Sequence, residues 1–260
     1  MIILKQNTMI DARALIRLIC LVVIASSCSY LPDDTSLEST EYNLEETSDY
    51  ILLEPIDAAN EVGLMFVPGG LVDPHAYLKT LERFAIDNQM KVLILKVRSN
   101  LAIFNAKQAK RVRQEFEDTK WYIGGHSLGG VVAAMSVGNE PDKYEGLFMM
   151  GSYSITDLSS WNQPVFSFIA ELDGLSDPET YTENEPNLPD GIYIDSPYML
   201  GLGDTHGKTV YYTILGGNHA QFGSYGPQEG DNEANISADY QQNEIFSVLT
   251  ILMRNNGVEI

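Results

Sequence analysis

Short apolar segments without polar alternation constrain the fold of this chain more than any other feature of its 260 residues. Val62–Val67 and Gly146–Met150 are typical, because almost every side chain in them is apolar and neither face suits water. Strands that are buried on both faces form parallel sheets covered by helices. Segments with helical spacing of apolar residues lie between these strands. The alternation predicts the α/β class, with a mostly parallel, doubly wound sheet flanked by helices.

The expected strands and helices alternate from Tyr50 onward. We expect strands at Tyr50–Glu54, Val62–Val67, Lys91–Val97, Lys120–Gly124, Gly146–Met150, Val165–Ala170 and Val210–Leu215. We expect helices at His75–Asp87, Asn105–Asp118, Leu128–Val137 and Asp239–Arg254. In a sheet of this kind, ligands bind outside the carboxyl ends of the strands. Residues that directly follow a strand are therefore the candidates for a functional site.

Residues 1–27 have the order of an export signal, with three cations, then the apolar run Leu18–Ala25, then small residues. The run is too short to cross a bilayer, which takes about 20 apolar residues. Ala25–Cys28 resembles the lipobox of bacterial lipoproteins, which makes Cys28 a candidate for lipidation and for a membrane anchor in the cell envelope. A plain secretion signal and a buried N-terminal helix are the alternatives.

The two cysteines of the chain, Cys20 and Cys28, both lie in this N-terminal segment. The exported part would therefore have neither a disulfide nor a cysteine nucleophile. No cluster of metal-ligating residues stands out in the sequence. The acidic stretch Asp231–Glu233 hints at calcium, but a solvated loop is the favoured interpretation. We expect no metal and no cofactor.

Acidic residues dominate the chain, which has 36 Asp and Glu against 16 Lys and Arg and a formal net charge of −20. This charge excludes nucleic acid as a partner, since phosphates need a basic surface. Residues 28–48 contain six carboxylates and no cation, which predicts an acidic, flexible tether. One catalytic domain is then expected at residues 49–260. Because this domain is also acidic, a neutral substrate suits it better than an anion.

A nucleophile motif lies between an expected strand and an expected helix. Gly125-His126-Ser127-Leu128-Gly129 satisfies the pattern G-x-S-x-G. In this motif the serine lies on a sharp strand-to-helix turn, and glycines are needed where a side chain would collide with a neighbouring strand or helix. The helix that follows also directs its N-terminal amides toward the site. Ser127 is therefore the candidate nucleophile.

A serine nucleophile needs a base and an acid that orients the base. In hydrolases with this motif the chain order is serine, acid, histidine. Asp173 follows the expected strand Val165–Ala170, and His219 follows Val210–Leu215. Both residues therefore leave the sheet at the same edge as Ser127.

Other acids and histidines fit these roles less well. Glu171 lies too close to its strand and Asp177 lies four residues beyond Asp173. His126 is the variable position of the motif and is expected to be a packing residue, and His206 lies in a loop before the last strand, at the wrong end. His75 precedes Ser127 in the chain, although it opens a helix near the site.

Oxyanion stabilisation needs backbone N–H donors near the acyl group. One donor is the N–H of Leu128, which directly follows the nucleophile. The loop Pro68-Gly69-Gly70-Leu71 follows an earlier strand and should supply the second. Either Gly70 or Leu71 carries that amide, and a plain turn is the alternative.

These residues together resemble the α/β-hydrolase superfamily, and more narrowly a small bacterial and fungal group with a Gly-Gly-His-Ser-Leu-Gly-Gly elbow. The resemblance extends over residues 60–255. It is carried by Pro68–Pro74, Gly124–Gly130, Asp173–Leu175 and Gly216–Gly226, with Gln228 and Asp231. It implies the α/β-hydrolase fold, hydrolase activity and a triad of Ser127, Asp173 and His219.

The connections between the expected strands bear on the substrate. Only Ser152–Gln163 lies where larger lipases carry a lid, so we expect an open site that accepts small or exposed acyl groups. Residues 178–208 form a polar insertion that can border the pocket. The candidate substrate contacts are His75, Phe222 and Tyr225, with Tyr153 and Trp161 as further pocket aromatics and simple packing as the alternative for the aromatic residues.

The sequence thus predicts a serine hydrolase that cleaves a carboxylic ester, or a related acyl bond, of a small molecule through an acyl-enzyme. A non-catalytic, surface-anchored binding lipoprotein on the same fold is the alternative. We expect an exported protein, either a lipoprotein of the bacterial cell envelope or a periplasmic or secreted protein. Nothing in the sequence indicates an oligomeric state.

Overall fold

The computed structural model describes residues 30–33, 40–57, 60–97, 107–176, 178–194, 201 and 203–260, and the statements below concern these residues. The predicted export signal, Cys28 and Asp177 lie outside them. Within the described part, no helix combines the length and the hydropathy that crossing a membrane requires.

One sheet forms the centre of the described part. Its strands are β1 (Tyr42–Glu46), β2 (Tyr50–Pro55), β3 (Val62–Val67), β4 (Val92–Leu95), β5 (Lys120–His126), β6 (Gly146–Met150), β7 (Val165–Ala170), β8 (Gly191–Ile194) and β9 (Thr209–Ile214). Their spatial order is β1-β2-β4-β3-β5-β6-β7-β9-β8. β2 pairs antiparallel with β1 and with β4, and all other neighbours pair in parallel.

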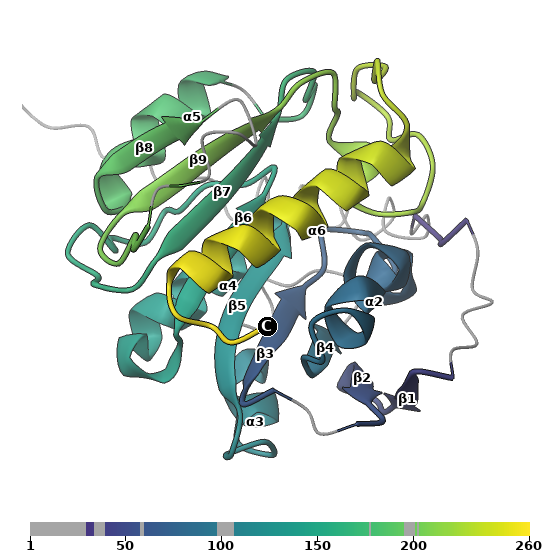
Figure 1. The fold of residues 1–260 in the computed structure, drawn as a ribbon. Helices are drawn as coiled ribbons and strands as arrows, with labels where there is room; N and C mark the ends of the chain where they lie inside the picture. The colour runs from purple at the N-terminus through teal and green to yellow at the C-terminus, as the bar shows by residue number, and fades with distance from the viewer. Residues whose placement is uncertain are drawn as a thin grey trace, which may run out of the picture.

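Helices cover both faces of this sheet (Figure 1). The α-helices are α2 (Leu78–Ile86), α3 (Gln108–Arg113), α4 (Leu128–Asn139), α5 (Pro178–Asn184) and α6 (Ala238–Asn255), and the short 3-10 helices are η1 (Pro74–Tyr77), η4 (Pro141–Lys143), η5 (Glu185–Asn187) and η7 (Ala220–Phe222). α2 and α6 pack on one face, and α3 and α4 pack on the other. The predicted α/β class is confirmed.

Strand β3 shows why the sequence has no polar alternation. Leu64 and Phe66 pack in the core cluster under α2 and α6, whereas Met65 and Val67 pack in the cluster under α3 and α4. All four side chains are buried. Removing a large apolar side chain from water stabilises the fold by about 1.5–3 kcal/mol. Both faces of the strand therefore contribute to stability, and both must be apolar.

Part of the predicted tether is folded, which corrects the expectation for residues 28–48. Tyr42–Glu46 form β1, which pairs along its whole length with β2. Tyr42 is buried, and the rest of the strand is exposed. Tyr30 also forms a bridge with Val72. An edge strand is held by backbone hydrogen bonds and can be polar on both faces, so its composition resembles that of a tether. The folded domain begins before residue 49.

The insertion at residues 178–208 is also partly folded. It contains α5, η5 and β8, and β8 pairs in parallel with β9 at the other edge of the sheet. Strand β8 has no clear apolar pattern in the sequence, because it is only 4 residues long and two of them are exposed. The helix predicted at Asn105–Asp118 is shorter in the described part, where α3 spans Gln108–Arg113.

Candidate active site

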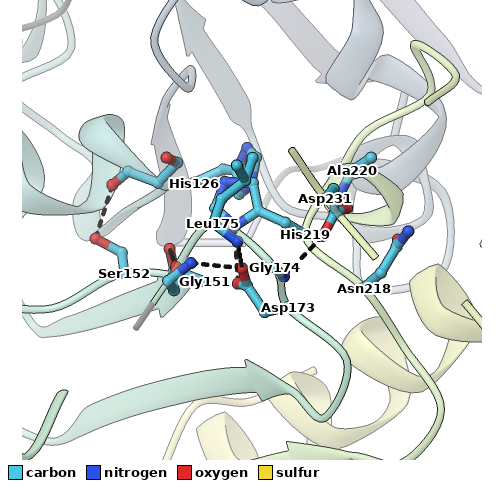
Figure 2. Close-up of polar contacts among 12 residues, drawn as sticks. His126, Gly151, Ser152, Asp173, Gly174, Leu175, Asn218, His219, Ala220 and Asp231 are labelled. Carbon is cyan, nitrogen blue, oxygen red and sulfur yellow. Dashed lines mark hydrogen bonds and ion pairs between the residues drawn. The ribbon is translucent and has the colours of Figure 1, made fainter. Parts of the chain in front are cut away.

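The three predicted triad residues follow strands that run in parallel. Ser127 follows β5, Asp173 follows the end of β7, and His219 follows the end of β9. Parallel strands point in the same direction, so all three residues lie at one edge of the sheet. Figure 2 shows the surroundings of Asp173 and His219 at this edge.

Ser127 has a strained backbone at the turn between β5 and α4. Its φ is 52° and its ψ is −126°, in a region that residues with a side chain rarely adopt. Two hydrogen bonds hold it there. The Ser127 N–H donates to the Met150 carbonyl at 2.9 Å, and the Ser152 hydroxyl donates to the Ser127 carbonyl at 2.7 Å. This is the predicted strand, sharp turn and helix.

The glycines beside Ser127 allow close backbone contact. A Cβ on Gly129 would lie 2.1 Å from the Val67 carbonyl oxygen and 2.4 Å from that of Pro68. A Cβ on Gly125 would lie 2.5 Å from the Gly129 carbonyl carbon. No side chain fits at such distances. The turn therefore packs directly against the end of β3 and the loop that follows it.

Asp173 and His219 form a buried acid–base pair. The Nδ1 atom of His219 lies 2.7 Å from Oδ2 of Asp173, and the two side chains are 2% and 3% exposed. The other oxygen, Oδ1, accepts hydrogen bonds from the N–H of Leu175 at 2.9 Å (Figure 2) and from the N–H of Ser176 at 2.8 Å. Both oxygens of the carboxylate are engaged, which fixes its orientation toward the imidazole.

This pairing leaves the second ring nitrogen of His219 available as a base. When Nδ1 donates its hydrogen to Asp173, neutral imidazole has an acceptor at Nε2. That Nε2 atom is buried and has no hydrogen-bond partner among the described residues. The structure gives no hydrogen bond between Nε2 and the Ser127 hydroxyl. In enzymes without bound substrate this bond is commonly long, and it tightens in the reactive complex.

The predicted oxyanion donors lie on two adjoining segments. Leu128 is the first residue of α4, and Gly70 and Leu71 belong to the loop after β3. Within the described part of the chain, the N–H groups of these three residues have no hydrogen-bond partner. Leu71 has a φ of 64°, so this loop is strained as well. Their role as donors stays a prediction.

His126 is a second buried histidine next to His219. Its ring centroid lies 4.4 Å from that of His219. Its Nδ1 atom lies 2.8 Å from the Tyr77 hydroxyl, which accepts a hydrogen bond from the Gly69 N–H at 3.0 Å. Burial raises the pKa of Tyr77, so the phenol keeps its hydrogen and donates it to Nδ1. Burial and the neighbouring His219 lower the pKa of His126 well below its usual value. His126 is therefore a neutral packing residue.

The candidate substrate contacts have different environments. His75 is partly exposed, and its ring nitrogens lie 2.7 Å from Asp73 Oδ1 and 3.2 Å from Glu46 Oε2. Tyr225 is buried and donates its hydroxyl hydrogen to Gln228 Oε1 at 2.9 Å. Substrate contact by His75 and Tyr225 stays a prediction.

Phe222 differs from the other two candidates. Its side chain is completely buried, and its ring packs edge-on against His219 with the centroids 6.5 Å apart. It also packs against the ring of His126. Phe222 therefore packs against the His219 imidazole inside the protein, and its side chain does not form a surface that a substrate reaches.

Two side chains that the sequence analysis did not assign to the site hold the histidine segment. Gln241 on α6 is completely buried and bonds to both backbone groups of Asn218, accepting from its N–H at 3.1 Å and donating to its carbonyl at 2.9 Å. Glu171, considered only as an alternative acid, accepts from the Gly216 N–H at 2.8 Å. An inward-facing glutamine on an amphipathic helix is the signal that points to Gln241.

The insertion at residues 178–208 borders Asp173. Tyr181 on α5 packs edge-on against Tyr153, with their ring centroids 6.5 Å apart. Burial raises the pKa of Tyr181, and the charge of nearby Asp173 adds to this effect. The predicted closeness of residues 178–208 to the site therefore holds for α5. Trp161 donates from its indole N–H to the Pro141 carbonyl.

Comparison with known proteins agrees with this geometry. A model of the alpha/beta hydrolase family matches residues 63–197 and 203–243, which is more than half of the chain. The chain therefore belongs to the alpha/beta hydrolase family. No sequence among curated proteins matches it.

Several solved structures share the fold at low sequence identity. The esterase of Pyrobaculum calidifontis is 11% identical with a TM-score of 0.56, and the match covers 98% of this chain and 96% of that protein. Est1E from Butyrivibrio proteoclasticus, with ferulic acid bound, is 10% identical with a TM-score of 0.55, covering 84% and 98%. The thioesterase domain from the curacin biosynthetic pathway is 11% identical with a TM-score of 0.53, covering 80% and 100%. At this identity the likeness concerns the fold alone.

Proposed function

We propose that this protein is a serine hydrolase that cleaves carboxylic esters, or related acyl bonds, of small neutral molecules. The observation that carries the proposal is the buried Asp173–His219 pair at 2.7 Å, on the same sheet edge as a serine with a φ of 52°. A strained serine at a strand-to-helix turn is the hallmark of the nucleophile elbow. A buried carboxylate on Nδ1 of a histidine is the arrangement that activates such a serine.

Acylation uses these groups in sequence. As Oγ of Ser127 attacks the acyl carbon, Nε2 of His219 accepts the hydroxyl proton, and the carbonyl electron pair moves to its oxygen. Asp173 stabilises the imidazolium through Nδ1. The N–H of Leu128 and an N–H of Gly70 or Leu71 stabilise the oxyanion. Collapse of the intermediate breaks the bond to the leaving alkoxide, which takes the proton from His219.

Deacylation repeats these steps with water. Water gives a proton to Nε2 of His219 while its oxygen attacks the acyl carbon, and the second oxyanion occupies the same amide site. Collapse then releases the carboxylic acid, and Ser127 recovers its proton from the imidazolium. The histidine acts as a base and then as an acid in each half-reaction.

The choice of substrate class has two supports. The sequence carries a net charge of −20, which disfavours an anionic acyl group. The solved structures that share the fold include one named as an esterase and one named as a thioesterase domain. Short neutral esters are therefore the first choice, with thioesters, amides and lactones next in a substrate panel. We also place the chain in the narrower bacterial and fungal group with the Gly-Gly-His-Ser-Leu-Gly-Gly elbow.

Labelling with a fluorophosphonate probe tests the proposal directly. We expect the native protein to be labelled on Ser127 and to hydrolyse p-nitrophenyl acetate, and we expect the variant Ser127→Ala to do neither. Ser159→Ala is the matched control, because this serine is exposed and its hydroxyl donates to Asp157, away from the proposed site. Native protein that neither labels nor hydrolyses any ester of the panel would favour the non-catalytic binding lipoprotein.

We further propose export followed by lipidation of Cys28, with residues 1–27 removed. This proposal rests on the lipobox-like residues Ala25–Cys28. Expression in a bacterium fed with a labelled fatty acid should label the native chain and leave Cys28→Ser unlabelled. Unlabelled native protein in the culture medium or periplasm would indicate plain secretion instead.

A further inference from the structure

One carboxylate links the two loops that carry the acid and the base. Asp231 accepts from the N–H of Gly174 through Oδ1 at 2.9 Å and from the N–H of Ala220 through Oδ2 at 2.8 Å (Figure 2). Gly174 directly follows Asp173, and Ala220 directly follows His219. We propose that Asp231 is a positioning residue that sets the geometry between Asp173 and His219. This inference rests on the proposed hydrolase function.

The chemistry of this link requires a carboxylate. Each oxygen faces a backbone N–H from a different loop, and Oδ1 accepts a further bond from the Asn232 N–H at 2.9 Å. An ionised aspartate has two acceptors and no donor, and its hydrogen bonds are stronger than those of a neutral group. An asparagine at this position would direct an NH₂ group against one of the two N–H donors. The same contacts argue against calcium, since three N–H groups already occupy the oxygens.

The segment that carries Asp231 is itself held tightly against the acid loop. A Cβ on Gly174 would lie 2.7 Å from the Asn232 nitrogen and 2.7 Å from the Gly230 carbonyl oxygen, so the two backbones are in direct contact. The side-chain amide of Asn218 donates to the Asn232 carbonyl at 2.7 Å, from the residue directly before His219. The segment that carries Asp231 therefore contacts both loops, and the Asp231 side chain links them.

A small shift between these loops would have a large effect on catalysis. The Asp173–His219 bond is 2.7 Å long, and a misplacement of reacting groups by about 1 Å can lower a rate by about 100-fold. Each loop leaves a different strand, β7 or β9, and continues to a different part of the fold. The hydrogen-bonded link through Asp231 keeps the side chains of Asp173 and His219 in a fixed relative position. Asp231 touches neither substrate nor the reacting atoms in this role.

The test uses Asp231→Asn, with Asp231→Ser as a second variant that keeps one acceptor. Active sites are counted with a fluorophosphonate, and kcat and KM are measured with p-nitrophenyl acetate. We expect kcat per active site to fall by about 10-fold to 100-fold, with KM within about twofold of the native value. The low-field proton signal of His219 Nδ1–H in the NMR spectrum should shift or disappear. A merely structural role would lower the thermal midpoint and leave both readouts unchanged.

Asp190→Asn is the matched control. Asp190 is an exposed aspartate that pairs with Lys208, and its backbone carbonyl accepts from Thr209, the first residue of β9. It thus lies at the opposite end of the strand from His219, and we expect native kcat, KM and NMR signal.

The outcomes separate this inference from the proposed function. A native kcat per active site and a native low-field signal in both Asp231 variants would overturn the positioning role. Native protein that neither labels nor turns over would overturn the hydrolase function. The low-field signal alone would then decide on Asp231, since its loss in Asp231→Asn requires no turnover.

Discussion

The nucleophile elbow and the histidine segment lie side by side at one sheet edge, but they are held in different ways. The elbow, Gly124–Gly130, depends on backbone atoms that meet where no side chain fits, as at Gly129 and the Val67 carbonyl. The histidine segment, Gly216–Gly226, depends on side chains that reach it from elsewhere. Gln241 bonds to Asn218, and Asp231 bonds to Ala220.

This difference predicts different responses to substitution. Enlarging a glycine in the elbow produces a steric clash, which the surrounding backbone can relieve only by moving. Removing a supporting side chain from the histidine segment leaves buried polar groups unpaired, which costs less and allows the fold to persist. The elbow should therefore fail through loss of the fold, and the histidine segment through loss of geometry and rate.

The largest expected effect concerns the bond between the acid and the base. Asp173→Asn should lower kcat by about 10⁴-fold, because the amide favours the wrong imidazole tautomer and does not stabilise the imidazolium. The elbow is untouched, so the thermal midpoint should change little. Steady-state kinetics with p-nitrophenyl acetate and thermal unfolding check both statements. Asp204→Asn is the control, because Asp204 pairs with the exposed His206 before β9. A loss in kcat below tenfold would contradict the role of Asp173.

Gly129→Ala tests whether the elbow depends on close backbone contact at its glycines. The new methyl group would lie 2.1 Å from the Val67 carbonyl oxygen, so we expect a loss of about 3 kcal/mol in the free energy of unfolding, or no folded protein. Urea unfolding measures the loss. Gly201→Ala makes the same chemical change in open space and should leave stability near the native value. A cost below about 1 kcal/mol at Gly129 would show that the turn relaxes more easily than its packing indicates.

Gln241→Leu tests whether the histidine segment depends on the side chains that support it. The substitution leaves the buried N–H and carbonyl of Asn218 without partners, so the free energy of unfolding should fall by about 2 kcal/mol. The rate of fluorophosphonate labelling per folded molecule should fall as well, since Asn218 precedes His219. Gln114→Leu, at an exposed position, is the control. Native labelling kinetics in a destabilised Gln241→Leu protein would show that the segment keeps its geometry without this support.

His126 belongs to the elbow, its ring packs against His219 of the histidine segment, and it gives the smallest effect. Its pKa is lowered in the folded state by burial and by His219, so below pH 6.5 the unfolded chain binds a proton that the folded chain does not. Stability from this residue is fully present above its unfolded pKa. It falls by up to about 1.4 kcal/mol for each pH unit below that value. His126→Gln should remove this contribution.

Urea unfolding of native protein and His126→Gln at pH 7 and pH 5 measures the difference. Equal pH slopes for native protein and His126→Gln would show that His126 is protonated in the fold.

Much of the proposed site could be predicted, because its candidate residues lie in short sequence motifs or directly after expected strands. G-x-S-x-G between a strand and a helix pointed to Ser127 as the candidate nucleophile, and chain order pointed to Asp173 and His219 as its candidate partners. Strand β1 was not predictable, because an exposed edge strand has no apolar pattern that distinguishes it from a tether. The packing role of Phe222 was also hidden, since an aromatic residue near the site has the same sequence signal whether it faces the pocket or the core.

The sequence by itself determined the sheet class, the turn at Ser127 and the chain order of the proposed triad residues. These depend on local patterns, namely apolar runs, glycines beside a serine, and residues that follow strands. Only the tertiary structure decided which side chains link the loops of Asp173 and His219. Asp231 lies 58 residues beyond Asp173 in the chain, yet it bonds to the next residue, Gly174. Such a contact depends on how separate loops meet at the sheet edge, and a hydrogen bond between distant residues leaves no periodic pattern in the sequence.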